Sequence, residues 1–258
     1  MSPSPSSIPH LTFEHLTRAG VVHGVLTRHG GVSCAPYHSL NVGRLVGDEP
    51  EVVEENHRRA LRAFNRTLTG VAETRQVHGA EVVLVERHPA GAWERPAADG
   101  LVTDQPGVTL FMRFADCVPV LLFEPQKKVI GLVHAGWRGT VNRVVQNAVA
   151  VMQKRYGARP QNMLAGIGPS ICAEHYPVGE EVVTQVQTVF GPEASEVLLR
   201  QNGTAKLDLW AANRLILQQA GVMQIEVSGR CTACEVENWF SHRAEQGRTG
   251  RFGALIGL

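Results

Sequence analysis

The sequence lacks the features of several large protein classes. It has no apolar run near the roughly 20 residues that a membrane-spanning helix needs, and it has no run of Lys or Arg. Its net charge is +1 and its pI about 7.8, so it does not have the strong basic character typical of nucleic-acid-binding proteins. This charge balance does not exclude small anions as ligands, because a few well-placed arginines are enough to bind them.

Familiar catalytic and cofactor motifs are missing too. The Gly-Ile-Gly at 166–168 is followed by Pro169, so the dinucleotide-binding fingerprint is incomplete. There is no Walker A loop, no HExxH zinc motif and no HxE…PCxxC deaminase signature. No HxH pair occurs, and a three-copper cluster needs many histidines close together, so the sequence gives no physical support for such a cluster.

Cysteine is scarce, with five residues in the whole chain. An odd, low count fits a reducing compartment better than a disulfide framework. The first nine residues are rich in Ser and Pro and do not resemble a secretory signal, so we expect a cytoplasmic protein. Cys231 and Cys234 form a CxxC pair, but no second CxxC or HxxxH completes a zinc ribbon. We interpret this pair as structural, with a redox role as the alternative.

The length of 258 residues and the hydrophobic content of 43% suit one large domain. We expect residues 1–15 to be a disordered tail, residues 16–258 to be a single domain, and 91–98 to be its most mobile loop. Strands are predicted at 21–27, 82–86, 100–103, 108–114, 119–123, 129–133, 163–167, 224–227 and 252–257, and several of the central ones are near-continuous apolar runs that suit strands buried on both faces. Helices are predicted from Pro50, with Asp48 as a cap, and over 140–156, 180–190 and 209–220. Central strands with helices outside them indicate a layered α/β domain.

The segment Val129–Thr140 holds the first polar cluster. A buried strand ends at His134, and Gly136 and Gly139 permit a tight turn into a helix. Free N–H groups at the helix start, with Arg138 beside them, predict an anion site, although a capped turn with a surface arginine would give the same pattern. A histidine ring at the end of an apolar strand needs a polar partner, which favours the functional interpretation.

Two further segments place metal-ligating side chains near strand ends. Asp116 and Cys117 interrupt two apolar strands, and His78 lies in the segment QVHG. A lone cysteine is more often a core residue, and a lone histidine is usually structural or exposed. Together, however, His78, Cys117 and His134 match a three-ligand zinc site with an open fourth position. The three lie 39 and 17 residues apart with no short ligand pair, so spacing alone does not establish the site.

Two polar segments are candidates for substrate binding. The C-terminal segment 238–253 forms either a solvated basic face or a substrate clamp, and it holds His242, Arg243, Arg248 and Arg251. A glycine-rich loop near the N-terminus begins at Arg28 and reaches Asn41, and its backbone can approach a ligand closely. We therefore take Arg28, Asn41, Arg138 and His242 as candidate substrate-binding residues.

In this order, the motifs resemble those of a known family. TRHGGVS, LNVG, QVHG, ADGLVT, DCVP, HAGWRG, GIGPSIC and the closing CTAC…WFSHR…TGR…LIGL are similar to those of the YfiH-like, laccase-domain family, also labelled multicopper polyphenol oxidase. The resemblance runs from about Val21 to the last residue. It implies an α/β fold of four α/β/β/α layers with mixed sheets, similar to that of a CNF-type bacterial toxin with a cysteine–histidine hydrolase site.

The resemblance also implies an activity and a cofactor. Matched by motif, His78, Cys117 and His134 would hold zinc, and copper can occupy the same ligands because it binds them more tightly. The implied reaction is phosphorolysis of adenosine, inosine and methylthioadenosine to free base and (thio)ribose 1-phosphate, with adenosine deamination as a second activity. The closing SxR motif matches Arg243. One departure is His242, which stands where we expect an aromatic residue such as Tyr.

These roles make 16–258 a single catalytic domain. Its expected catalytic residues are Cys117, His134, Asp116 and Arg243. We expect Arg243 and Arg138 to hold phosphate, and Asp116 either to act as an acid/base or only to orient a ligand. The expected partners are purine nucleosides and phosphate, with no nucleic acid and no membrane. The sequence does not decide whether the chain is a homodimer.

Three other hypotheses compete with a zinc-dependent phosphorylase. Cys117 as nucleophile with His134 as base would make a thiol hydrolase acting on an amide; only the third ligand, His78, favours a metal instead. A copper-dependent oxidase of phenols is the second, and the absence of HxH argues against it. A non-enzymatic partner-binding domain is the least favoured, since polar residues that interrupt buried strands are expensive in a pure scaffold.

Overall fold

The structure is a computed structural model, and it describes residues 8–86, 89, 94–201 and 203–258. The predicted tail at 1–7 and the part of the predicted loop at 91–93 lie outside the described residues. No helix within the described ranges has both the length and the apolar character that crossing a bilayer requires.

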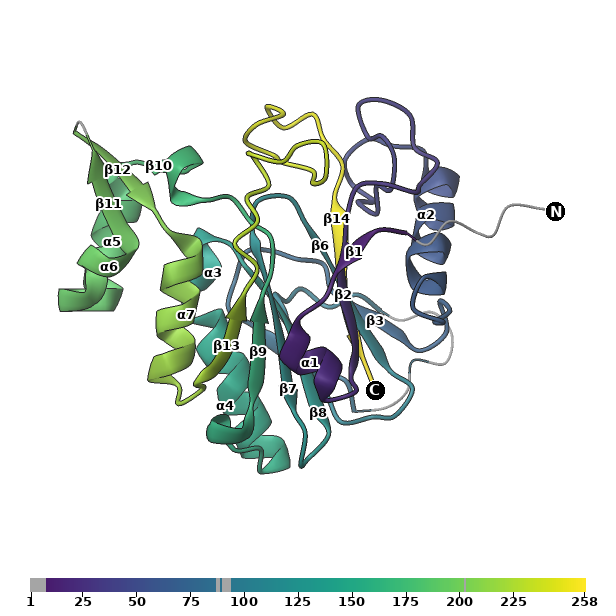
Figure 1. Cartoon of the computed structure of the whole chain (residues 1–258), viewed down its shortest axis with the longest axis horizontal. Helices are drawn as coiled ribbons and strands as arrows, with labels where there is room; N and C mark the ends of the chain where they lie inside the picture. The colour runs from purple at the N-terminus through teal and green to yellow at the C-terminus, as the bar shows by residue number, and fades with distance from the viewer. Residues whose placement is uncertain (1–7, 87–88, 90–93, 202) are drawn as a thin grey trace.

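Two large mixed sheets lie at the centre of the molecule (Figure 1). The five-stranded sheet, in the order β1-β2-β14-β6-β3, consists of β1 (His10–Leu11), β2 (Val22–Leu26), β14 (Phe252–Gly257), β6 (Thr109–Phe114) and β3 (Val71–Glu73). The six-stranded sheet, in the order β13-β9-β7-β8-β5-β4, consists of β13 (Gln224–Val227), β9 (Leu164–Ile167), β7 (Val118–Glu124), β8 (Val129–Ala135), β5 (Gly100–Thr103) and β4 (Val82–Leu84). The pairs β3/β6, β4/β5 and β9/β13 are parallel, and the other pairs are antiparallel.

The two sheets pack face to face through apolar side chains. Met112 and Phe252 from one sheet join Leu121 and Leu132 from the other in one buried cluster. Every residue of β7 and β8 is buried, because helices cover the outer face of their sheet. This double burial explains why those strands read as near-continuous apolar runs.

Helices cover both outer faces. The helix α2 (Pro50–Arg62) packs against the five-stranded sheet through Ala60 and Leu61. The helices α4 (Val144–Tyr156) and α7 (Leu209–Gln219) cover the six-stranded sheet on the opposite side (Figure 1). The layers therefore run α/β/β/α, which confirms the predicted fold class.

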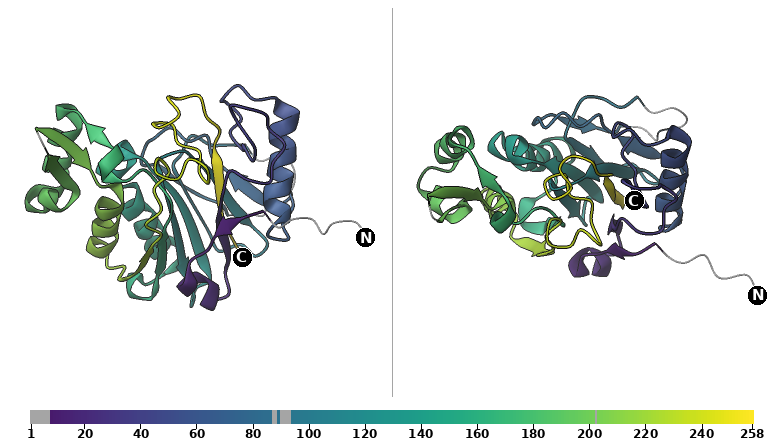
Figure 2. Two further views of the ribbon diagram at one scale, coloured as in Figure 1. Left: turned by 45° about the horizontal axis from the view of Figure 1, so that its top comes forward. Right: turned by 90° about the horizontal axis from the view of Figure 1, so that it is seen from above.

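The remaining elements are short or peripheral. A small sheet in the order β10-β12-β11 projects at one end and consists of β10 (Pro177–Val178), β12 (Thr204–Leu207) and β11 (Leu198–Gln201). The other helices are α1 (Glu14–Arg18), α3 (Trp137–Val141), α5 (Glu180–Phe190), α6 (Ala194–Val197) and the 3-10 turns η1 (Pro160–Asn162), η2 (Ala173–His175) and η3 (Gly191–Glu193). The C-terminal loop between β13 and β14, in yellow, lies over one end of the two large sheets (Figure 2).

The N-terminal boundary predicted at residue 15 is too late. Ile8 and Phe13 are buried, and β1 pairs with β2. The ring of Phe13 occupies the space beside Gly166, where a Cβ atom would lie 2.4 Å from the ring. Ser and Pro content describes only the first few residues, and the apolar anchors that follow fix residues 8–15 to the sheets.

Two helix predictions also need correction. The single helix predicted over 140–156 is two helices, α3 and α4, because Arg143 between them adopts a left-handed φ of 57°. Asp48 does not cap α2, whose N-terminal residue before the first turn is Glu49. The Asp48 carboxylate instead accepts hydrogen bonds from the Ser33 hydroxyl at 2.6 Å and the Asn41 amide at 2.8 Å.

Candidate metal and substrate site

Strand register brings the three predicted metal ligands together. In the antiparallel pair β7/β8, Val118 faces Ala135, so Cys117 and Gly136 meet just beyond the paired residues. His134 lies one position before the end of β8, and His78 approaches from the loop between β3 and β4. The ligand atoms of His78, Cys117 and His134 all lie within 4.8 Å of one another.

The segment that carries the cysteine crosses from one sheet to the other. β6 ends at Phe114 in the five-stranded sheet, and β7 begins at Val118 in the six-stranded sheet. Asp116 in this crossing has a φ of 80°, a backbone conformation that is uncommon for residues other than glycine. The crossing thus places Cys117 where the two layers meet.

Gly136 leaves the space that a metal ion needs beside the sulfur. A Cβ atom at this position would lie 2.8 Å from Cys117 Sγ and 3.3 Å from His78 Cδ2. One thiolate and two imidazoles are ligands that suit zinc and copper, and three protein ligands keep one position open. The residues present therefore fit a catalytic divalent ion.

Asp99 orients both histidines, and sequence analysis missed it. Its buried Oδ1 lies 2.8 Å from the ring atom Nδ1 of His134 and accepts the backbone N–H of His78 at 3.0 Å. Its Oδ2 accepts the N–H groups of Val77 at 3.1 Å and Gly79 at 2.7 Å. A proton held on Nδ1 by the carboxylate leaves His134 Nε2 free as a metal ligand. The signal was a buried aspartate at a strand start within the motif ADGLVT.

The electrostatics favour the thiolate. Burial opposes ionisation of Cys117, but His134 and His78 outweigh it and lower the pKa of the thiol to about 6. Burial opposes protonation of His134, but Cys117 and Asp99 raise its pKa to about 9. Burial raises the pKa of Asp99, yet its hydrogen bonds to His134 and to the Gly79 N–H bring that pKa below its usual value. A thiolate is the form of cysteine that binds metal and attacks electrophiles.

A cavity of about 680 Å³ opens onto this cluster. Its volume lies within the roughly 300–1,000 Å³ of small-molecule sites. Seven arginines line it against one carboxylate, Asp116, and they are Arg44, Arg75, Arg95, Arg113, Arg138, Arg243 and Arg251. A cavity lined by one sign of charge attracts ligands of the opposite sign, so this cavity suits an anion.

The seven arginines fall into two groups. The side chains of Arg44, Arg95 and Arg113 lie 3.9, 3.7 and 3.5 Å from the carboxylate of Glu73. For the other four, Arg75, Arg138, Arg243 and Arg251, no carboxylate lies within ion-pair distance in the part of the chain that is described. This second group can neutralise an anionic ligand.

Two of those arginines lie over aromatic rings at the cavity wall. The guanidinium of Arg138 lies 4.9 Å from the centroid of Trp137, and that of Arg243 lies 5.1 Å from the centroid of Tyr176. Burial and the nearby Cys117 raise the pKa of Tyr176 to about 12. The wall therefore combines cations with flat apolar faces.

Asp116 ties the C-terminal loop to this wall. Its Oδ1 accepts hydrogen bonds from the hydroxyls of Thr232 and Ser241, both at 2.7 Å, and its Oδ2 accepts the N–H of Arg243 at 2.7 Å. The carboxylate thereby fixes the position from which Arg243 and His242 reach the cavity, where both line the wall.

The structure does not bring Arg28 and Asn41 to the cavity wall. Arg28 donates to the carbonyls of His38 and Val236, and it pairs with Glu245 at 3.1 Å. Because its donors already have protein partners, direct contact with a substrate is not supported.

Asn41 lies behind the residues that line the cavity. It is fully buried, and its side-chain oxygen accepts the N–H groups of Gly43 at 2.8 Å and Arg251 at 2.9 Å. Gly43 and Arg251 line the cavity themselves. Asn41 therefore positions two lining residues, and the sequence pattern could not distinguish this role from substrate contact.

Comparison with known proteins decides the family. Residues 22–258 match the family model described as multi-copper polyphenol oxidoreductase laccase. The chain belongs to this family. It is 42% identical over 250 residues to a purine nucleoside phosphorylase of Deinococcus radiodurans, covering 97% of this chain and 94% of that protein. It is 41% identical over 249 residues to purine nucleoside phosphorylase YlmD of Geobacillus stearothermophilus, covering 93% and 90%.

Solved structures agree with the fold. The YfiH protein of Bacillus licheniformis superposes with a TM-score of 0.92 at 32% identity over the full length of both chains. YlmD of Geobacillus stearothermophilus gives a TM-score of 0.89 at 40% identity, covering 93% of this chain and 92% of that one. The predicted family and fold are confirmed. The family description implies copper-type metal binding, which a cysteine–histidine cluster can provide.

Proposed function

We propose that this chain is a zinc-dependent purine nucleoside phosphorylase. The observation that carries the proposal is a three-donor cluster, His78, Cys117 and His134, beside an arginine-lined cavity in a chain whose relatives are named purine nucleoside phosphorylase. When bound, the ion supplies positive charge that orients phosphate or polarises the nucleoside. Copper fits the same ligands, and metal analysis distinguishes the two.

Phosphorolysis breaks the bond between C1′ of the sugar and the purine nitrogen. A phosphate oxygen forms a new bond to C1′, and the electron pair of the broken bond leaves with the purine, which takes up a proton. Phosphate must lie on the sugar face opposite the base. Arg138 and Arg243 lack carboxylate partners within the described ranges and are our phosphate-binding residues.

The aromatic residues of the wall suit the purine. Trp137 and Tyr176 line the same cavity as the arginines and offer flat faces for stacking. His242 lines it as well, at the position where an aromatic residue was expected from the family motif. We assign Asp116 a positioning role, since its carboxylate already accepts three hydrogen bonds from the C-terminal loop.

Product analysis tests this function. Purified full-length protein is incubated with adenosine, with and without phosphate, and adenine and ribose 1-phosphate are measured. We expect phosphate-dependent adenine from the wild type, none from Cys117→Ala, and full activity from Cys34→Ala, which changes an exposed cysteine outside the cavity. Inosine and methylthioadenosine are tested in parallel.

Other products would change the assignment. Inosine from adenosine would reveal the deaminase activity that the family resemblance implies. If folded, zinc-loaded protein forms neither adenine nor inosine, the proposal fails at the level of the substrate. The five free cysteines are consistent with a reducing compartment, so we place this activity in the cytoplasm, which fractionation would test.

One arrangement favours a second candidate function, a thiol hydrolase. Cys117 hydrogen-bonds to His134, whose other ring nitrogen contacts Asp99, and this is the order nucleophile, base and orienting carboxylate. His78 on the other side of the sulfur favours a metal instead. Iodoacetamide separates the two functions: a hydrolase thiolate reacts at once, whereas a metal-bound thiolate reacts only after chelation.

A further inference from the structure

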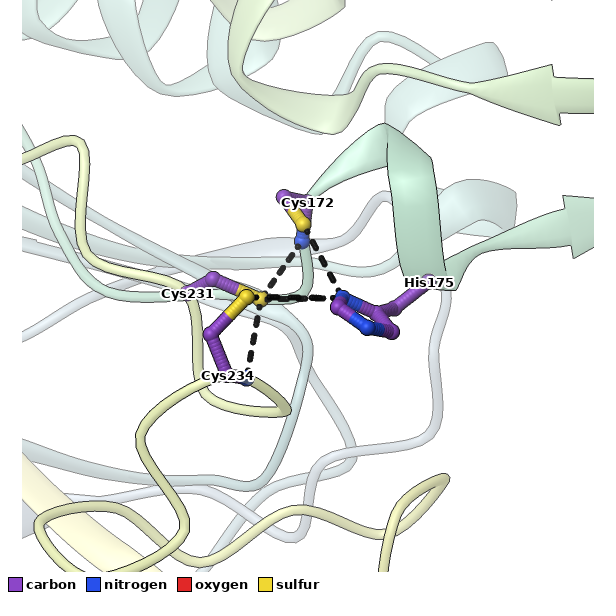
Figure 3. A group of neighbouring side chains, drawn as sticks. All are labelled: Cys172, His175, Cys231 and Cys234. Carbon is purple, nitrogen blue, oxygen red and sulfur yellow. Dashed lines mark hydrogen bonds between the residues drawn. The ribbon is translucent and has the colours of Figure 1, made fainter.

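A second group of cysteine and histidine side chains lies outside the cavity (Figure 3). It consists of Cys172, just before the turn η2, His175, the last residue of that turn, and Cys231 and Cys234 from the loop after β13. Their four ligand atoms all lie within 4.8 Å of one another. The CxxC pair is evident in the sequence, but its partner is not, because the second pair is a CxxH and lies about 60 residues earlier.

The three sulfurs converge on one ring nitrogen. His175 Nδ1 lies 3.3 Å from the sulfur of Cys172, 3.9 Å from that of Cys231 and 3.5 Å from that of Cys234. A ring nitrogen has one N–H or one lone pair, so hydrogen bonding explains at most one of these contacts. In a tetrahedral zinc site, Zn–S distances of about 2.3 Å and Zn–N distances of about 2.0–2.1 Å put sulfur and nitrogen about 3.5 Å apart. The observed distances scatter around this value.

Backbone groups support the central sulfur. Cys231 Sγ accepts the N–H of Cys172 at 3.3 Å and the N–H of Cys234 at 3.4 Å. Donors aimed at a thiolate disperse its negative charge and fix its direction, as groups behind metal ligands commonly do. A buried cysteine that only fills the core would not need two such donors.

The two loops are held in register by their own backbone. Ser170 forms an isolated bridge with Cys231, its N–H donates to Arg230 O at 3.2 Å, and its carbonyl accepts the N–H of Thr232 at 3.1 Å. The pairing lies next to both ligand pairs. The fold therefore brings the four donors together through main-chain contacts that do not depend on the ligands themselves.

We propose that Cys172, His175, Cys231 and Cys234 form a second metal site that binds one zinc ion in a closed, structural Cys₃His set. Four protein donors leave no open position for a substrate, in contrast to the cluster at the cavity. Two of the donors, Cys172 and Cys231, are buried, and the other two are exposed, so the site lies at the surface.

This site would stabilise one wall of the cavity. Thr232, next to Cys231, donates its hydroxyl to Asp116, and the N–H of Ile171, next to Cys172, donates to the Asp116 carbonyl at 3.1 Å. Tyr176 follows His175 directly and lines the cavity. A metal that links the two loops would thus hold Asp116 and Tyr176 in place without touching the substrate.

Metal content per chain tests the proposal. The full-length protein is purified without chelator, and zinc is measured for the wild type, Cys117→Ser, Cys234→Ser and the double variant. We expect about two, one, one and zero ions per chain. Cys34→Ser, which changes an exposed cysteine outside both clusters, keeps two. The readout does not use nucleoside turnover, so failure of the second site and failure of the proposed phosphorylase are distinguishable.

A second measurement covers variants that fail to fold. In the native wild type, alkylation followed by mass spectrometry should find Cys172, Cys231 and Cys234 protected, and a chelator should expose all three. Substitution of cobalt(II) for zinc should add thiolate-to-cobalt absorption that Cys117→Ser only reduces. A wild type with one zinc, lost in Cys117→Ser, would overturn the proposal. A disulfide between any two of the three cysteines in freshly purified protein would also overturn it and identify a redox pair instead.

Discussion

The cluster at the cavity and the Cys₃His cluster use the same side-chain chemistry in different ways. His78, Cys117 and His134 offer three donors beside a cavity of about 680 Å³, and two of them stand at the ends of paired sheet strands. The Cys₃His cluster offers four donors from loops outside that cavity. Three donors leave room for a reacting molecule, and four do not. The number of donors and the access to the cavity, more than the ligand types, separate a catalytic site from a structural one.

The groups that hydrogen-bond to the ligands also differ between the two clusters. At the cavity, the buried carboxylate of Asp99 contacts His134 and the backbone of His78, which fixes the direction of the ligands. At the Cys₃His cluster, backbone N–H groups support Cys231. A carboxylate tunes the basicity of a histidine ligand, whereas N–H donors reduce the reactivity of a thiolate.

Cys117→Ser should have the largest effect. Loss of the thiolate removes the metal and the charge beside the reacting groups, so kcat/KM should fall by about 1,000-fold or more, roughly 4 kcal/mol of transition-state stabilisation. The melting temperature should change little, because the surrounding strands are held by the sheet. Steady-state kinetics and calorimetry on this variant and on Cys34→Ser provide the comparison. Retention of full zinc and activity would exclude Cys117 as a ligand.

Asp99→Asn should have the next largest effect. The neutral amide can no longer balance a charged ring, and its NH₂ group cannot accept the backbone N–H groups of Val77 and Gly79. Metal affinity should therefore fall by about 10- to 100-fold. Competition with a chromogenic chelator measures this. Asp104→Asn is the matched control, since Asp104 follows β5, the strand that Asp99 precedes, and its carboxylate accepts a hydrogen bond from the neighbouring Gln105 away from the cavity. Equal affinities in the two variants would remove Asp99 from the site.

Arg243→Met should mainly weaken phosphate binding. The methionine keeps part of the apolar contact with Tyr176 but loses the cation, so KM for phosphate should rise about 10-fold, roughly 1.4 kcal/mol, while KM for the nucleoside changes less. Arg155→Met, at an exposed arginine paired with Glu86, is the control. A larger rise in the nucleoside KM would instead place Arg243 on the base or the sugar.

Cys231→Ser should have the smallest effect on turnover and the largest effect on stability. If the Cys₃His cluster is structural, loss of about 3 kcal/mol would lower the melting temperature by roughly 6–12 °C. Turnover at 25 °C should stay within about 10-fold of the wild type, since no reacting group is lost. Calorimetry with and without chelator measures the shift. An unchanged melting temperature together with abolished turnover would reverse the roles of the two clusters.

Apolar periodicity predicted most of the secondary structure. Strands buried on both faces, such as β7 and β8, gave the clearest pattern, because both sides of each strand are covered. The short strands β1 and β3 were not predicted, since two or three residues carry too little pattern. The break at Arg143 escaped it as well, because the apolar spacing continues across the left-handed residue.

The residues of the candidate site were also predicted only in part. Motif resemblance selected His78, Cys117 and His134, and the structure brings all three together. Arg28 and Asn41 looked equally suitable in the sequence, but buried polar residues that serve the backbone resemble ligand-binding residues until their partners are known. Asp99 was not predicted as a site residue for the same reason.

By itself, the sequence determined the layered α/β architecture, the family, and the residues that could serve as metal ligands, because the apolar pattern and the order of the motifs can be read along the chain. Only the tertiary structure decided which of those residues meet. Cys172 and Cys231 are 59 positions apart, and they become neighbours because β9 and β13 lie side by side and their following loops pair through Ser170. Convergence of ligands depends on strand order and register, and those follow from the packing of the whole chain rather than from any local pattern.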